Sequence, residues 1–173
     1  MDYGIYIDID RCIGCQACAV ACMDQNDLEI DKGECSWRTI YRVEKNNYPV
    51  AKASYISMGC MHCQDAPCIM GCPTGAIWRA ESGRVAVDES LCIGCHSCLM
   101  SCPFGVPRYN IYGKMRKCDL CWGRVEAGLE PACVRVCPGK ALKFGPVNEL
   151  SKQVESKAAE KLAGAALHPM VAG

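Results

Sequence analysis

The chain has 173 residues and carries 19 lysines and arginines against 19 aspartates and glutamates, so its formal charge is zero. That length suits one compact domain or two small fused ones, and the charge balance argues against a nucleic-acid-binding protein. The 17 cysteines indicate either a disulfide scaffold or a metal-binding protein. Because the chain has only two phenylalanines and three tryptophans, we expect something other than side chains to fill much of the interior.

The N-terminal segment predicts a strand and no targeting signal. Residues 3–9 read as a strand, and residues 1–5 lack the basic and apolar regions of a signal peptide. No twin-arginine pair precedes the first cysteine, and no apolar run approaches the roughly 18 residues that a membrane helix needs. We therefore expect a cytoplasmic protein without a membrane span, whose reduced cysteines bind metal. The alternative is a periplasmic protein exported together with a signal-bearing partner.

Sixteen of the cysteines form four groups with short spacings. Groups one and three are C-x2-C-x2-C-x3-C runs, whereas the spacings are two, four and three in group two and two, eleven and three in group four. The members are Cys12, Cys15, Cys18 and Cys22 (group one); Cys60, Cys63, Cys68 and Cys72 (group two); Cys92, Cys95, Cys98 and Cys102 (group three); Cys118, Cys121, Cys133 and Cys137 (group four). A proline follows groups two, three and four, so group three carries the complete bacterial ferredoxin signature C-x2-C-x2-C-x3-C-P, and the pattern predicts [4Fe–4S] clusters. Only Cys35 is left over, and we expect a free thiol without a role.

The spacing has a chemical reason. Three closely spaced thiolates on one loop can hold three corners of a cube, and Gly14 and Gly94 let backbone amides turn toward the sulfurs. We expect the fourth cysteine to start a helix and to ligate the neighbouring cluster, with the following proline in the first helical turn. Zinc is the main alternative because C-x2-C pairs bind it, but zinc ribbons leave no role for a third cysteine in the same loop.

The connections between the groups predict short strands and one helix. Residues 37–56 alternate enough to suggest a hairpin, after an acidic stretch that either docks a partner or simply covers the body. Residues 76–87 read as a hairpin with a turn at Gly83, and residues 141–144 read as a strand. The tail, 147–166, predicts an amphipathic helix that docks on a partner, on another copy of the chain or on its own body; its apolar positions are Leu150, Val154, Ala158, Leu162 and Ala165.

The groups are expected to pair as in two-cluster ferredoxins, with groups two and three together and groups one and four together. Crossed ligation then assigns Cys12, Cys15, Cys18 and Cys137 to cluster A; Cys22, Cys118, Cys121 and Cys133 to cluster B; Cys60, Cys63, Cys68 and Cys102 to cluster C; and Cys72, Cys92, Cys95 and Cys98 to cluster D. The predicted fold class is α+β, with two ferredoxin-like modules, short β-hairpins and helices, and a C-terminal amphipathic helix. One module, 59–103, is inserted into the other, 1–58 with 104–146, and 147–173 forms the helical tail.

Other side chains near the groups have two interpretations each. His62 and His96 either donate to cluster sulfurs or lie on the loop surface. Four cations near group four either raise a cluster potential or form a solvated basic patch; they are Lys114, Arg116, Lys117 and Arg124.

Several stretches carry a family resemblance that covers roughly residues 5–145. They are 12–18 (CIGCQAC), 21–28, 36–38 (SWR), 60–68 (CMHCQDAPC), 72–76, 102–107 (CPFGVP), 114–121 (KMRKCDLC), 131–133 and 137–138. In these the chain resembles the iron–sulfur subunits of the dimethyl-sulfoxide reductase family, which includes polysulfide and tetrathionate reductases, formate dehydrogenases and related molybdenum or tungsten enzymes. Because all sixteen positions are cysteine, the resemblance implies four [4Fe–4S] clusters and a partner subunit with a molybdenum or tungsten bis-pterin centre.

The chain shows no acid–base or nucleophile constellation, so we expect electron transfer and no catalytic site of its own. The leading hypothesis is the redox subunit of a cytosolic aldehyde or formate oxidoreductase, with a further flavin, ferredoxin or quinone-linked partner and with self-association as an option. The alternatives are an exported, membrane-associated respiratory reductase for a sulfur compound, a free polyferredoxin and, in another class, a zinc module.

Overall fold

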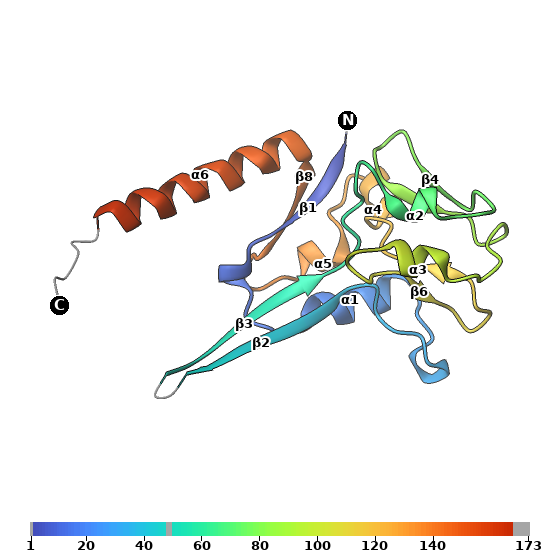
Figure 1. The fold of residues 1–173 in the computed structure, drawn as a ribbon, viewed down its shortest axis with the longest axis horizontal. Helices are drawn as coiled ribbons and strands as arrows, with labels where there is room; N and C mark the ends of the chain where they lie inside the picture. Colours follow the sequence, from blue (N-terminus) through green and yellow to red (C-terminus); the bar gives the residue numbers. More distant parts are fainter. Residues whose placement is uncertain (1, 48–49, 168–173) are drawn as a thin grey trace.

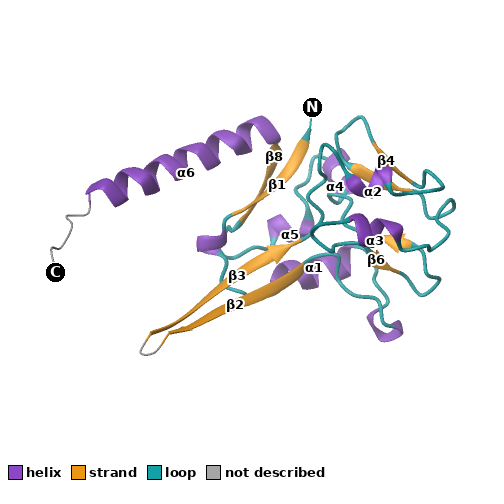
Figure 2. Cartoon of the chain, in the orientation of Figure 1, coloured by secondary structure: helices purple, strands orange, loops and turns teal. Residues whose placement is uncertain are grey.

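The computed structural model describes residues 2–47 and 50–167 (Figure 1). Its strands form four separate two-stranded antiparallel sheets within that part of the chain. Loops make up much of the side that holds α2, β4, α3 and β6, as Figure 2 shows. The fold is therefore a mixed arrangement of small helices and small strands around cysteine-bearing loops.

The two ends of the body meet in one sheet. Strand β1 (Tyr3–Ile7) pairs with β8 (Leu142–Pro146), so that Tyr3 lies opposite Pro146 and Ile7 opposite Leu142. The predicted strands are confirmed, but β1 is shorter than expected. It ends because the Asp8 carboxylate accepts the Asp10 amide at 3.2 Å and caps the 3-10 turn η1 (Ile9–Arg11).

The two predicted hairpins are also confirmed. Strands β2 (Thr39–Asn47) and β3 (Val50–Met58) pair along their length and project from the body (Figure 1). The tip, 48–49, lies outside the described residues. Strands β4 (Ile77–Arg79) and β5 (Val85–Val87) join through a turn in which Gly83 has φ of 78°.

A third short hairpin, β6 (Arg108–Tyr109) with β7 (Met115–Arg116), was not predicted. Its strands are too short to show an alternating pattern in the sequence.

Four short helices follow the cysteine loops, and their position corrects one expectation. They are α1 (Ala17–Gln25), α2 (Pro67–Met70), α3 (Ser97–Ser101) and α5 (Ala132–Arg135). Each begins one residue before the third cysteine of its group, and the fourth cysteine lies one turn later, inside α1 or just past the end of the others. The prediction that the fourth cysteine starts a helix is therefore wrong, because the loop already turns into the helix at the third.

The helices pack in pairs, α1 against α5 and α2 against α3. The remaining short helices are η2 (Ile30–Lys32) and α4 (Trp122–Glu126). The hydrophobic cores are small and include cysteines of the predicted ligand sets. One contains Ala66, Ile77, Val85, Cys98 and Met115, and the other Cys18, Cys133, Val134 and Leu142. Few large side chains contribute, as the composition led us to expect.

The predicted C-terminal helix is confirmed as α6 (Val147–Leu167). Leu150 is buried, and Lys157 forms ion pairs with Asp8 and Asp10, so the helix docks on β1 and η1. Much of its length is exposed and extends away from the body (Figure 1). Residues 168–173 of the predicted tail and the side chain of Ala165 lie outside the described part. Within that part, no helix combines the length and apolar character needed to cross a membrane.

Candidate metal centres

The loops of groups one and three have the same backbone course. Gly14 and Gln16 have φ of 72° and 63°, and Gly94 and His96, at the corresponding positions, have φ of 68° and 63°. Left-handed backbone is unfavourable for residues with a Cβ, so its repetition at Gln16 and His96 marks a loop shape that the cysteine spacing imposes. In each group the first two cysteines lie in the loop and the third in the first turn of the helix, and all three line one space.

Three cavities are each lined by four cysteines. Cavity A is lined by Cys12, Cys15, Cys18 and Cys137. Cavity B is lined by Cys22, Cys118, Cys121 and Cys133. Cavity D is lined by Cys72, Cys92, Cys95 and Cys98. These linings coincide with the sets predicted for clusters A, B and D; that they hold clusters stays a prediction.

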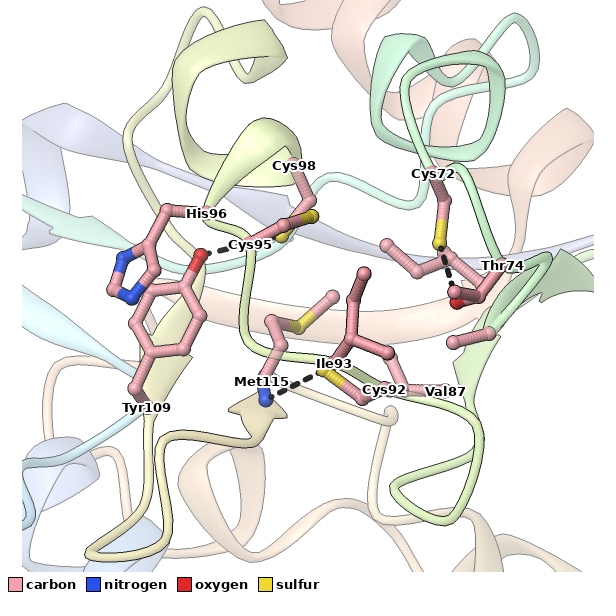
Figure 3. Close-up of a pocket in the computed structure, with 12 residues that line it drawn as sticks. Cys72, Thr74, Val87, Cys92, Ile93, Cys95, His96, Cys98, Tyr109 and Met115 are labelled. Carbon is pink, nitrogen blue, oxygen red and sulfur yellow. Dashed lines mark hydrogen bonds between the residues drawn. The ribbon is translucent and has the colours of Figure 1, made fainter.

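Figure 3 shows cavity D, with its cysteines around a central space and Tyr109 and Met115 at the edge. The Tyr109 hydroxyl lies 3.3 Å from the Cys98 sulfur, a contact that sequence reasoning missed. The Met115 amide donates to the Cys92 sulfur at 3.4 Å. The cavity therefore offers thiols as ligands and polar hydrogens that can face a negatively charged group.

The remaining four predicted ligands, Cys60, Cys63, Cys68 and Cys102, are all half-buried. Burial raises the pKa of the Cys68 thiol. The His62 amide donates to the Cys60 sulfur at 3.4 Å. Helix α2 packs on α3, so Gly71 lies against Ser101, the residue before Cys102. The predicted set of four is named site C here, and that contact brings the end of group three to the helix of group two.

Cysteines of two neighbouring sites lie in α1 and at α5. In α1, Cys18 lines cavity A and Cys22 lines cavity B; in its partner helix, Cys133 lines cavity B, and Cys137, just past the end of α5, lines cavity A. The two cysteines of α1 are four residues apart, so they lie roughly 6 Å apart along the helix axis. The x3 spacing thus places one cysteine of each site about one helical turn from a cysteine of the other.

The donor sets fit a cubane cluster. Four thiols in each of the three cavities and amide hydrogens directed at sulfur suit a group with negative charge and four tetrahedrally disposed metal corners. Burial raises the pKa of the Cys133 thiol to about 12 and that of Cys121 to about 11, so metal binding must displace their protons. Across residues 2–47 and 50–167, no three His, Cys, Asp or Glu side chains converge closely enough to hold a single metal ion.

The two histidines differ in their surroundings. His62 is buried, and its Nδ1 accepts the Val85 amide at 3.0 Å, which leaves Nε2 as the protonated nitrogen. That buried Nε2 has no protein partner among the described residues. Burial, reinforced by the charge of Lys117, lowers the pKa of His62 to about 2, so the ring stays neutral. His96 is exposed and stacks on Tyr109 at 3.9 Å between ring centroids.

The four cations near group four do not form one solvated patch. Lys117 is buried and donates to the carbonyls of Val85 and Cys118. Arg116 instead pairs with Glu89 at 2.9 Å and Glu34 at 3.4 Å. The other two are partly exposed and donate mainly to backbone carbonyls: Lys114 to Cys92 and Arg124 to Glu130. Only Lys117 has the buried position from which a charge acts strongly on a neighbouring site.

Comparison with known proteins gives the same class of centre. A family model described as a 4Fe-4S dicluster domain matches residues 51–147, and one described as a 4Fe-4S binding domain matches residues 9–23.

Three relatives represent the curated proteins that the chain resembles. The B subunit of the anaerobic dimethyl sulfoxide reductase of Escherichia coli is 44% identical over 160 residues, which cover 87% of this chain and 77% of that protein. The thiosulfate reductase electron transfer subunit PhsB of Salmonella typhi is 44% identical over 150 residues, 85% of this chain and 77% of the relative. The iron-sulfur subunit of the nitrate-inducible formate dehydrogenase of Escherichia coli is 37% identical over 169 residues, 89% of this chain and 58% of the relative.

Proposed function

The chain belongs to the family of iron–sulfur subunits that includes the B subunit of anaerobic dimethyl sulfoxide reductase, and on that premise we propose that it conducts electrons between a catalytic molybdenum or tungsten bis-pterin subunit and a second redox partner. The family models and the cysteine count support four [4Fe–4S] clusters as its cofactors. Each cluster, when bound, accepts and passes on one electron. The chain itself contributes ligands, spacing and electrostatics, and has no catalytic site of its own.

The observation that carries the proposal is the set of three cavities, each lined by four thiols from two cysteine groups. We assign cluster A to cavity A, cluster B to cavity B, cluster C to site C and cluster D to cavity D, with the crossed ligands given above. The pairing of β1 with β8 and the packing of α1 on α5 support the companion proposal that module 59–103 is inserted into module 1–58 with 104–146.

The contacts between sites support the order A, B, C, D. Sites A and B share helices α1 and α5, and the cysteines of C and D share α2 and α3. Val85 links the loops of B and C: Lys117, the residue before Cys118, donates to its carbonyl, and its amide donates to His62 of the group-two loop, which supports placing B next to C. Short steps of this kind keep electron transfer between neighbouring clusters fast.

The two ends of this order reach the surface. Cys15 in cavity A and Cys95 in cavity D are exposed, whereas three of the four cysteines in cavity B are buried. Ile13 and Ile93, beside these end sites, are 63% and 65% exposed. We propose that the catalytic subunit docks over one end and the electron donor or acceptor over the other.

The comparisons favour a reductase as the complex that this chain serves. Two of the relatives named above are subunits of a dimethyl sulfoxide reductase and a thiosulfate reductase, and each is 44% identical, against 37% for the formate dehydrogenase subunit. We therefore propose a molybdenum-dependent reductase for a sulfur-containing acceptor, in place of the aldehyde or formate enzyme that sequence analysis favoured. Fractionation of cells that express the whole complex distinguishes a cytosolic enzyme from one exported with its catalytic subunit.

Iron and acid-labile sulfide analysis of the anaerobically purified complex tests the cofactor content. We expect about sixteen of each per copy of this chain, beyond any cluster of its partner. Molybdenum in the same sample supports the proposed catalytic subunit. Zinc without sulfide contradicts the proposal at its first step.

Paired alanine variants test the crossed ligation. Cys12→Ala with Cys137→Ala removes two ligands from one proposed cluster, so three intact [4Fe–4S] clusters are expected. The matched control, Cys12→Ala with Cys22→Ala, damages two proposed clusters and leaves two intact. Low-temperature EPR with iron analysis counts the intact clusters, and the reverse pattern would mean that groups one and four do not exchange their fourth cysteines.

A further inference from the structure

Arg38 is a buried cation located between cavities A and B. Its side chain is only 2% exposed and lines cavity B. Its Nη1 donates to the carbonyl and to the hydroxyl of Ser57, both at 3.1 Å. Ser57 lines cavity A, and its hydroxyl lies 3.4 Å from the Cys18 sulfur. One guanidinium therefore reaches both cavities, directly on one side and through a hydroxyl on the other.

No carboxylate neutralises this charge. Across the described parts of the chain, no Asp or Glu oxygen lies within 4.0 Å of the Arg38 nitrogens. An unpaired buried charge is strongly unfavourable unless opposite charge surrounds it. The groups around Arg38 are cysteines instead: Cys22, Cys118 and Cys133 line cavity B together with it, and the Ser57 hydroxyl bridges it to Cys18. All four are predicted ligands of clusters A and B.

The backbone leaves room for the guanidinium. A Cβ built at Gly59 would lie 3.0 Å from Nη2 of Arg38, tighter than ordinary van der Waals contact. Because Gly59, which follows β3, has no side chain, the Arg38 guanidinium can lie against the backbone at that point. Arg38 is held by hydrogen bonds and close packing, so its position relative to the cavities is built into the fold.

We propose that the positive charge of Arg38 raises the reduction potentials of clusters A and B, an inference that rests on the proposed function. Each cluster gains negative charge on reduction, and two neighbouring clusters repel one another's added electron. A fixed cation between them stabilises both reduced states and offsets this repulsion, and the low dielectric of the interior strengthens the effect. The Ser57 hydroxyl acts on cluster A alone.

Potentiometric titration of the intact complex, followed by EPR, tests the proposal. Arg38→Gln removes the charge and keeps polar atoms. We expect the reduction potentials of two of the four clusters to fall. At a fixed applied potential, the ratio of reduced to oxidised cluster should decrease on the order of tenfold, which corresponds to about 59 mV for one electron. Arg38→Lys keeps the charge and restores potentials close to those of the unmodified protein. Ser57→Ala shifts one member of the same pair.

Lys117 provides a matched comparison. It is buried, and its Nζ donates to the carbonyl of Cys118, which lines cavity B, and to that of Val85, whose amide donates to His62 in the loop of site C. Lys117→Gln is therefore expected to shift one cluster of the Arg38 pair and one other cluster.

The outcomes separate this inference from the proposed function. Four clusters with unchanged potentials in Arg38→Gln overturn the role of Arg38 and leave electron conduction intact. An equal shift in the reduction potentials of all four clusters also overturns the role of Arg38. So does a fall in potential in Arg38→Lys as large as the fall in Arg38→Gln. Absence of four clusters in the unmodified protein refutes the proposed function instead. If Arg38→Gln loses clusters, Arg38→Lys becomes the test. Potentials close to those of the unmodified protein support the role of Arg38, and lowered potentials of clusters A and B overturn it.

Discussion

The glycine in the loop of group three offers the sharpest test of how the fold shapes a cluster site. Gly94 has φ of 68°, and a Cβ there would lie 2.7 Å from the carbonyl oxygen of Gly113. An L-residue in left-handed backbone costs about 1–2 kcal/mol. The contact with Gly113 adds to this, because a backbone oxygen in a hairpin turn cannot rotate away. We expect Gly94→Ala to destabilise the protein by roughly 3 kcal/mol or more.

Gly105 is the matched control, since it has φ of 57° but open space where a Cβ would be. Gly105→Ala should therefore show only the backbone cost of about 1–2 kcal/mol. Loss of visible cluster absorbance on heating measures both variants. Each kcal/mol lowers the midpoint by about 2–4 °C in a domain of this size. Equal midpoints for the two variants would show that the contact with Gly113 does not limit the site, and would refute the reasoning.

Three further predictions concern the surface and cavity D. Lys157→Ala removes ion pairs that hold α6 to the body, so amide hydrogen exchange in α6 should speed up while the iron content stays the same. Lys161 and Lys157 lower the pKa of Asp10 to about 2. The ion pairs between α6 and Asp10 are therefore fully formed above pH about 4 and weaken as the pH falls toward 2, and amide hydrogen exchange in α6 at graded pH measures this. Cys35→Ser should leave iron, sulfide and EPR spectra unchanged, because the exposed thiol belongs to none of the four sites; loss of a cluster would contradict the ligand sets. Tyr109→Phe removes a hydroxyl 3.3 Å from a cysteine sulfur and should lower the potential of one cluster by on the order of tens of millivolts, whereas unchanged potentials would mean that the hydroxyl does not donate to that sulfur.

Local features of the fold followed from the sequence because they depend on neighbouring residues. The turn at Gly83, the strands on either side of it and the long hairpin before group two have the composition and alternation of strands and turns, and the structure contains them. The class of cofactor followed in the same way, since three thiols within seven residues can surround a cubane and have little other use. The start of each helix was misplaced by more than one turn. For α1 and α3 the reason is that proline and spacing do not reveal the left-handed backbone of Gln16 and His96, the residues just before these helices.

The tertiary structure showed by which contacts distant residues meet. Crossed ligation, taken from the pattern of two-cluster ferredoxins, had already placed Cys137 with Cys18 in one predicted set. The structure adds the physical reason: Cys18 and Cys137 line one cavity because α1 packs on α5, and no local spacing encodes that contact. A charged residue in a sequence also carries no sign of its burial: Arg38 and Lys117 look like surface cations until the packing removes them from water. The cysteine pattern alone therefore determined what this protein binds. The packing of helices and hairpins decided which sites are neighbours and which charges lie between them, because those depend on contacts between residues far apart in the chain.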